Sequence, residues 1–318
     1  LSCGEKVLTV GGRSRRGRRH RRRDADGRRH PRPMNTIAVG VDLSPESEAA
    51  AHWAAASARD GDRLLLIHGF AAAVALQPLS EFELDFDVTA TRQAAAAHLT
   101  AVAGRLGTRH PGLRIETVVE HDFAIPLLTR LSGQVDLMVL GHHRPGLIER
   151  LTTGSISSAL SARSRCPVVT VPYGNLATGG PVVAAIDADA PSDLALSTAF
   201  EYADATGNPV AIVCAIPDDA PPARIEAVYA RADALLEPWR RRFPDRDTTL
   251  QLVNGNPSRA VGEAVPQASL LVVTRPRAGS TFATWAGSVA RAAQHHTRCP
   301  IAIVDHSRSG HLDRGSTS

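Results

Sequence analysis

The sequence predicts an α/β protein made of two tandem domains, each a parallel sheet sandwiched between layers of helices. Three observations lead to this fold class. Short apolar runs alternate with amphipathic segments, landmark sequences recur at a constant spacing, and 318 residues suit two domains of about 140 residues each. Apolar residues make up 43% of the chain, which is enough to form two cores.

The first copy alternates expected strands and helices. An apolar strand at 37–41 ends at Asp42, after which Ser44 can cap a helix and Pro45 can occupy its first position. Short continuous apolar strands separated by amphipathic helices are typical of a parallel sheet that is buried on both faces. The expected strands are 37–41, 63–69, 113–120, 137–140 and 168–171, with helices around 45–54, 89–106, 125–131 and 155–164.

The second copy repeats this order. Constant spacing at separate landmarks indicates a duplication, and the change of offset shows that the second copy lacks about 12 residues, which we expect to fall in a loop. The matching segments are 165–171 with 298–304, 154–155 with 287–288 and 135–140 with 268–273 at an offset of 133, and 38–42 with 183–187 at an offset of 145. The expected strands are 182–186, 210–215, 248–253, 270–274 and 301–304, with a helix at 222–243.

The last strand of each copy, 168–171 and 301–304, is apolar and would be an open sheet edge in an isolated domain. Pairing the two edges removes this liability. We therefore expect one chain to fold as a pseudo-dimer of its two copies. Association into a homodimer of chains remains open.

The ends of the chain differ from its body. Eleven Arg and Lys6 against three acidic residues give residues 1–33 a charge of +9, which leaves −5 of the total of +4 for residues 34–318. We expect residues 1–33 to be a basic tail that is disordered and dispensable, or Met34 to be the natural start; a nucleic-acid-binding arm is the disfavoured alternative. The expected domains are 34–173 and 180–305, followed by a disordered tail at 306–318.

Several classes of protein are excluded or disfavoured by composition. No apolar run approaches the length of about 18 to 20 residues that a membrane span needs, and because the first residues show no apolar segment before a small-residue cleavage site, we expect no signal peptide. Cys166 and Cys299 each precede Pro at a strand entrance and read as buried apolar side chains; with Cys3 and Cys214 they form no zinc or disulfide spacing. We predict a cytoplasmic protein without a metal site.

Candidate ligand contacts lie where parallel α/β sheets bind ligands, beyond the carboxyl ends of the strands. Asp42 follows the first strand and could accept hydrogen bonds from an adenine amine or a ribose hydroxyl. Gly141 ends the fourth strand, and Gly154–Ser155 open a helix whose first N–H groups could hold a phosphate. A structural interpretation remains open, in which the glycines serve tight turns and Asp42 caps the following helix.

The segment 139–144 (VLGHHR), nine further residues, Gly154–Ser155 and the closing 165–168 (RCPV) resemble the signature of the universal stress protein (UspA-like) family. In ATP-binding members that signature is Gly, two residues, Gly, nine residues, Gly, then Ser or Thr. The chain is similar to tandem, two-domain members of actinobacterial type. The resemblance implies a flavodoxin-like or adenine nucleotide alpha hydrolase-like sheet, pairing through the last strands, and ATP or adenine-nucleotide sensing.

The resemblance also carries over a set of nucleotide contacts. Arg144 stands where the family has its second Gly. In the second copy Thr274 replaces the first Gly of the signature and Arg277 the second, so the first copy is the better candidate for ATP. The implied contacts are Val41, Asp42, Gly141, His143, Arg144, Gly154, Ser155 and Ile156 in the first copy, and Asp187, Gly287 and Ser288 in the second.

Three functions stay open from the sequence. The leading one is a non-catalytic regulatory or stress-response protein that binds ATP or another adenine nucleotide. The second is a scaffold or interaction module whose sites are degenerate. The third is slow ATP hydrolysis, although residues 34–318 contain no Lys and thus no conventional phosphate-loop enzyme. No dedicated catalytic residues are predicted.

Overall fold

The structure, a computed structural model, describes residues 8–9, 35–71, 87–142, 156–174, 179–189, 192–216, 219–254, 268–275 and 299–305. The first half of the chain alternates strands and helices in the predicted order. Its elements are β2 (Thr36–Gly40), α1 (Pro45–Ser57), β3 (Arg63–Gly69), α2 (Val88–Arg109), β4 (Arg114–Glu120), α3 (Ala124–Leu131), β5 (Leu137–His142), α4 (Ile156–Arg163) and β6 (Val168–Pro172).

The second half repeats the arrangement. It includes α5 (Asp193–Thr206), a helix for which the repeat alone supplied no bounds. The remaining elements are β7 (Val182–Ile186), β8 (Val210–Ile216), α6 (Pro222–Arg242), β9 (Thr248–Asn254), β10 (Leu270–Thr274) and β11 (Ile301–Val304), together with β1 (Leu8–Thr9) from the amino-terminal segment.

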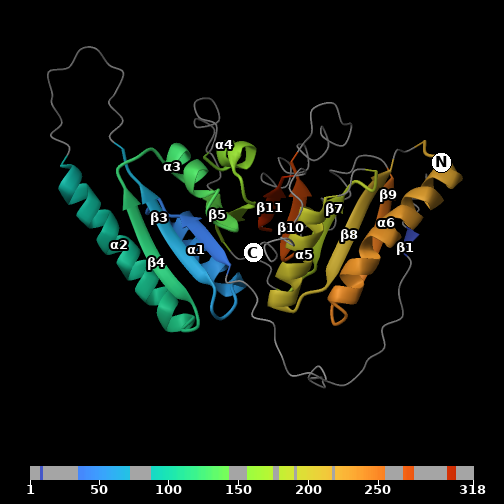
Figure 1. Cartoon of the computed structure of the whole chain (residues 1–318), viewed down its shortest axis with the longest axis horizontal. Helices are drawn as coiled ribbons and strands as arrows, with labels where there is room; N and C mark the ends of the chain where they lie inside the picture. The colour runs from blue at the N-terminus through green and yellow to red at the C-terminus, as the bar shows by residue number, and fades with distance from the viewer. Residues whose placement is uncertain are drawn as a thin grey trace, which may run out of the picture.

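All these strands belong to one sheet in the order β1-β9-β8-β7-β10-β11-β6-β5-β2-β3-β4. Within each half the five repeated strands are parallel, so the predicted fold class is confirmed. Figure 1 shows the two halves of the sheet side by side, with α1, α2, α5 and α6 along the same face. In the first half, α3 and α4 pack on the opposite face through Leu127, Leu128 and Leu160.

Local sequence explains where the helices begin. The Ser44 hydroxyl accepts a hydrogen bond from the N–H of Ser47 at 3.2 Å, and Pro45 is the first helical residue, so the predicted start of α1 is confirmed. α2 begins earlier than the expected 89 because the Asp87 carboxylate accepts hydrogen bonds from the N–H groups of Thr89 and Ala90, at 2.8 and 2.9 Å.

The strand register confirms the duplication. Gly40 of β2 lies opposite Leu140 of β5, and adding the sequence offsets of 145 and 133 converts this pair into Ala185 and Val273, which are also partners. In the same way the pair of Met138 and Val168 becomes Leu271 and Ile301. Both copies therefore share one backbone arrangement at the strands where the candidate site lies.

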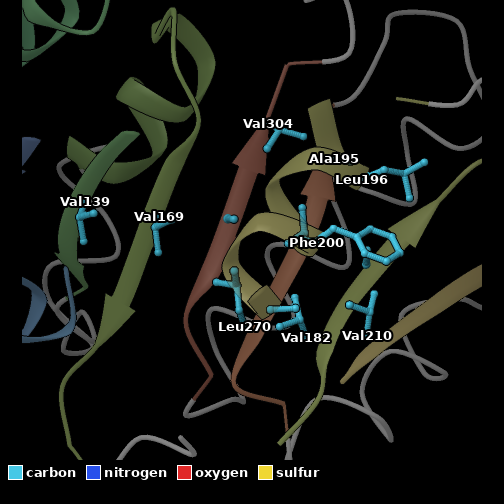
Figure 2. Packing of buried hydrophobic residues seen from close by; sticks show 14 of the residues in the cluster. Val139, Val169, Val182, Ala195, Leu196, Phe200, Val210, Leu270 and Val304 are labelled. Atoms are coloured by element: carbon cyan, nitrogen blue, oxygen red, sulfur yellow. The ribbon is translucent and has the colours of Figure 1, made fainter. Parts of the chain in front are cut away.

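The two halves join through their last strands, as predicted. β6 and β11 are antiparallel, with Val168, Val169 and Thr170 opposite Ile303, Ala302 and Ile301. One apolar cluster continues across this seam. Figure 2 shows Val139 and Val169 of the first half alongside Val304, Leu270 and Phe200 of the second. The predicted pseudo-dimer is thus a single packed body with one continuous sheet.

Leu8–Thr9 form the strand β1, which was not predicted from the sequence. They pair antiparallel with Leu252 and Gln251 of β9, which otherwise ends the sheet. An outer strand presents unpaired N–H and C=O groups, and a short added strand satisfies some of them. None of the helices in the described ranges has the length and the apolar content that a membrane span requires.

Candidate nucleotide site at the strand ends

The helices that follow β2 and β5, which are neighbours in the sheet, lie on opposite faces of it. From the end of β2 the chain passes to α1 on one face of the sheet, whereas α4, which follows β5, lies on the other face. Such a reversal is where open α/β sheets bind ligands. The structure brings Val41, Asp42 and Gly141 to this edge, and Ile156 is the first residue of α4. The predicted contacts His143, Arg144, Gly154 and Ser155, and the side chain of Ile156, lie outside the described residues.

Asp42 is held by the turn that starts α1. Its Oδ1 accepts hydrogen bonds from the N–H of Ser44 at 3.1 Å and from the Ser44 hydroxyl. Its own N–H donates to the Ser47 hydroxyl at 3.2 Å. Burial raises the pKa of Asp42, but the hydrogen bonds donated by Ser44 and Ser47 outweigh it and leave the pKa below its usual value. At neutral pH Asp42 is therefore a carboxylate that accepts hydrogen bonds only.

The structural interpretation, in which Asp42 caps the following helix, agrees with these contacts in part. Ser44 is the residue that caps α1, and Asp42 accepts hydrogen bonds from Ser44. Leu43, between Asp42 and Ser44, adopts a φ of +68°, the one positive φ among non-glycine residues of the described chain. This conformation is unfavourable for a residue with a Cβ, and such residues concentrate at functional sites. Leu43 is 43% exposed. An apolar side chain therefore stands at the edge next to the carboxylate.

Gly141 has a packing reason that the motif does not express. A Cβ at this position would lie 2.6 Å from the carbonyl carbon and oxygen of Glu46 and 2.7 Å from the nitrogen of Ser47. These are backbone atoms of the first turn of α1, which cannot move aside cheaply. The absence of a side chain at residue 141 therefore lets the start of α1 press directly onto the end of β5.

Three rings at the same edge were not among the predicted contacts. His68 is the second-last residue of β3, Phe70 follows β3, and His121 follows β4. The ring centroids of Phe70 and His121 are 5.3 Å apart, and those of His68 and Phe70 are 6.3 Å apart. His68 Nδ1 lies 2.7 Å from the carbonyl oxygen of Val41. Because a carbonyl only accepts, Nδ1 carries the proton. A signal existed in the sequence, since His68 and Phe70 share one strand face just after the apolar run.

The second half keeps the aspartate but rearranges its surroundings. Asp187 follows β7 and accepts a hydrogen bond from the N–H of Asp189 at 2.9 Å. α5 begins six residues after Asp187, whereas α1 begins three residues after Asp42. Thr274, which stands where the first half has Gly141, is buried. Gly287 and Ser288 lie outside the described residues, as does Arg277.

Comparison with known proteins identifies the family. A family model described as the universal stress protein family matches residues 34–172 and 180–305. The chain belongs to this family. It is a tandem universal stress protein, as the sequence motifs implied.

Related universal stress proteins match most of this chain and nearly all of their own length. One from Mycobacterium tuberculosis is 28% identical over 291 residues, which are 86% of this chain and 98% of the relative. One from Mycolicibacterium smegmatis is 29% identical over 283 residues, covering 84% and 96%. Among solved structures, a universal stress protein from Archaeoglobus fulgidus is similar with a TM-score of 0.63 and 16% identity, over 85% of this chain and 96% of that one. This likeness shows the fold.

The cysteines of this universal stress protein are packing residues where they are described. Cys166, Cys214 and Cys299 are buried and form no disulfide with one another. Burial raises the pKa of Cys214 and of Cys299 to about 12, so both thiols stay protonated at neutral pH. Within the described ranges, no three His, Cys, Asp or Glu side chains gather in a way that could hold a metal ion.

Proposed function

We propose that this universal stress protein binds ATP or another adenine nucleotide at the strand ends of its first half and acts as a regulatory, non-catalytic protein. The observation that carries the proposal is that Asp42 and Gly141 lie at the carboxyl ends of the neighbouring strands β2 and β5, where the chain changes sides of the sheet. An ionised Asp42 suits the donors of an adenine amine or a ribose hydroxyl.

The phosphates would extend toward the start of α4. The first N–H groups of a helix have no partner within the helix and favour an anion. The family signature assigns Gly154 and Ser155 to this position, with His143 and Arg144 in the loop before them. We include all eight first-half contacts in the proposal, and Asp187, Gly287 and Ser288 as a weaker second site.

Thr274 favours a second candidate function for the second half. A side chain replaces the glycine at this edge, and α5 begins farther from Asp187 than α1 does from Asp42. Both differences alter the place that would receive a nucleotide. The second half would then serve as an interaction module that supports the first half.

The proposal also assigns the rest of the chain. We place the domains at 34–173 and 180–305, with tails at 1–33 and 306–318, and the protein in the cytoplasm. Chains that associate into homodimers remain compatible with this assignment, because the continuous sheet ends in an outer strand, β4, that carries no further strand within the described residues.

The test is to purify the full chain, denature it and identify any released nucleotide, then to titrate ATP by calorimetry. Gly154→Asp should abolish binding, because a carboxylate at the helix start repels phosphate. Gly287→Asp is the matched control in the second half and should leave the first site intact. No detectable binding at millimolar ATP would favour the scaffold. Turnover of ATP above that of the Gly154→Asp variant would show slow hydrolysis.

A further inference from the structure

Both helices that frame the first-half site end against the second half. α1 is the first of them. Its first turn presses on Gly141, and its far end lies against α5, where the rings of Trp53 and Tyr202 stack with centroids 5.5 Å apart. Just beyond α1, the guanidinium of Arg59 donates to the carbonyl oxygen of Glu201 at 3.0 Å and to a carboxylate oxygen of Asp204 at 2.8 Å.

α4 is the second helix, and Arg275 of the second half reaches its carboxyl end. Arg275 follows β10, and its Nη2 donates to the carbonyl oxygen of Ser164, one residue beyond α4, at 3.2 Å. Its Nη1 lies 3.4 Å from a carboxylate oxygen of Asp305, and the backbone N–H of Arg275 donates to the carbonyl oxygen of Val304 at 2.7 Å. The side chain is only 20% exposed.

A cation at this place stabilises α4 in two ways. It satisfies a carbonyl that has no partner in the helix, and it faces the negative end of the helix dipole. α4 has eight residues, which is too short to be a stable helix without tertiary contacts. Its orientation therefore depends on what holds it, and Arg275 holds the end opposite to the one that would meet phosphate.

We infer that the second half is a built-in positioning partner for the nucleotide site of the first half, and that Arg275 is a positioning residue for α4. This inference rests on the proposed function. Affinity depends on how completely a site is arranged before the ligand arrives, because ordering it at binding costs free energy. The second half thus contributes to binding in the first half without touching the nucleotide.

The test compares Arg275→Gln and Arg275→Lys with the unaltered full chain. We expect Gln to weaken ATP binding about threefold to tenfold, and Lys, which keeps the charge and a donor, to recover most of the affinity. Arg63→Gln is the matched control, since Arg63 pairs with Glu116 at the opposite edge of the sheet and its loss removes the same charge. An equal loss of affinity in Arg63→Gln would overturn the inference.

Hydrogen exchange of the nucleotide-free protein separates this inference from the proposed function. Arg275→Gln should speed exchange of the amides of α4 while those of α3 keep their protection, and Lys should restore it. If the unaltered chain binds no ATP but Arg275→Gln still speeds exchange in α4, the positioning role stands and the proposed nucleotide binding fails. Unchanged exchange in α4 together with unchanged ATP affinity would overturn the positioning role.

Discussion

Trp53 and Tyr202 stack with their ring planes inclined by 14°, and they connect equivalent helices of the two copies. Trp53 belongs to α1 and is buried, whereas Tyr202 belongs to α5 and is partly buried against the shared core. Together with the pairing of β6 and β11, this contact joins the two copies into one packed body. Residues at the seam should therefore matter as much for stability as residues inside either half.

The first prediction concerns that contact. Tyr202→Ala removes the stacked ring and leaves part of the seam unfilled, so we expect a loss of about 2 kcal/mol in the free energy of unfolding. Tyr173→Ala is the control, because Tyr173 is 61% exposed and its loss should change stability by no more than about 0.5 kcal/mol. Urea unfolding followed by circular dichroism measures both. Equal effects of the two substitutions would show that the stack contributes nothing to the seam.

The second prediction concerns Gly141. Gly141→Ala places a Cβ within 2.6 Å of the backbone of Glu46, so α1 must shift away from β5. We expect a loss of about 1–3 kcal/mol and weaker nucleotide binding. Gly104→Ala in α2 has nothing within 4 Å of the added Cβ and should stabilise the protein by about 0.5–1 kcal/mol. Differential scanning calorimetry would reveal opposite shifts in Tm; a harmless Gly141→Ala would contradict the packing explanation.

The third prediction concerns the backbone at Leu43. Leu43→Gly relieves the positive φ and should raise the free energy of unfolding by up to about 1 kcal/mol, offset in part by the entropy of glycine. Leu43→Ala keeps a Cβ and should have little effect, since the side chain is exposed. If Gly and Ala behave alike in urea unfolding, strain at this position is negligible.

The fourth prediction is a pH dependence. The pKa of Asp42 is depressed in the folded state, so its contribution to stability is fully present above the unfolded pKa of about 3.9 and is lost as the pH falls through the folded value. Asp42→Asn should flatten the decline of unfolding free energy in this acidic range. Ser44→Ala should flatten it partly and cost about 1 kcal/mol at neutral pH through loss of the helix cap. Urea titrations between pH 2 and pH 7 would measure both, and an unchanged acid slope in Asp42→Asn would exclude this role.

The fifth prediction concerns thiol reactivity. Burial raises the pKa of Cys214 and Cys299 to about 12, so neither should react with a disulfide reagent at pH 8 in the folded protein. A Cys3→Ser variant removes the one cysteine outside the described residues. In that variant we expect no rapid labelling until denaturant is added, followed by labelling of all three remaining thiols. Rapid labelling of the folded variant would contradict the buried environment.

Much of the fold was predictable because local patterns and tertiary packing agree. The apolar run at 37–41, the Ser44 cap and the offset of 133 residues each specify an element or its copy without long-range information. Helix ends were less predictable: α2 begins at Val88 because Asp87 caps it, and it continues to Arg109, beyond the expected 106. β1 was missed because a two-residue strand exists only through its partner β9.

The candidate site was predictable only in part. Asp42 and Gly141 follow strands, and strand ends of a parallel sheet share an edge, so their meeting follows from the pattern. The rings of His68, Phe70 and His121 meet because β3 and β4 are neighbours in the sheet, which spacing along the chain does not express. The seam contacts of Arg59 and Arg275 join residues more than 100 positions apart.

The amino-acid sequence alone determined the duplicated α/β architecture, its apolar strands and the family motifs, because these depend on periodicity and on short-range chemistry. Only the tertiary structure shows that a side chain at residue 141 would collide with α1, which rings meet at the strand ends, and that the second half contacts α1 and α4 of the first half. Each of these is a contact between elements distant in the chain. Their energies depend on distance and burial in space, and neither quantity is encoded in any local stretch of residues.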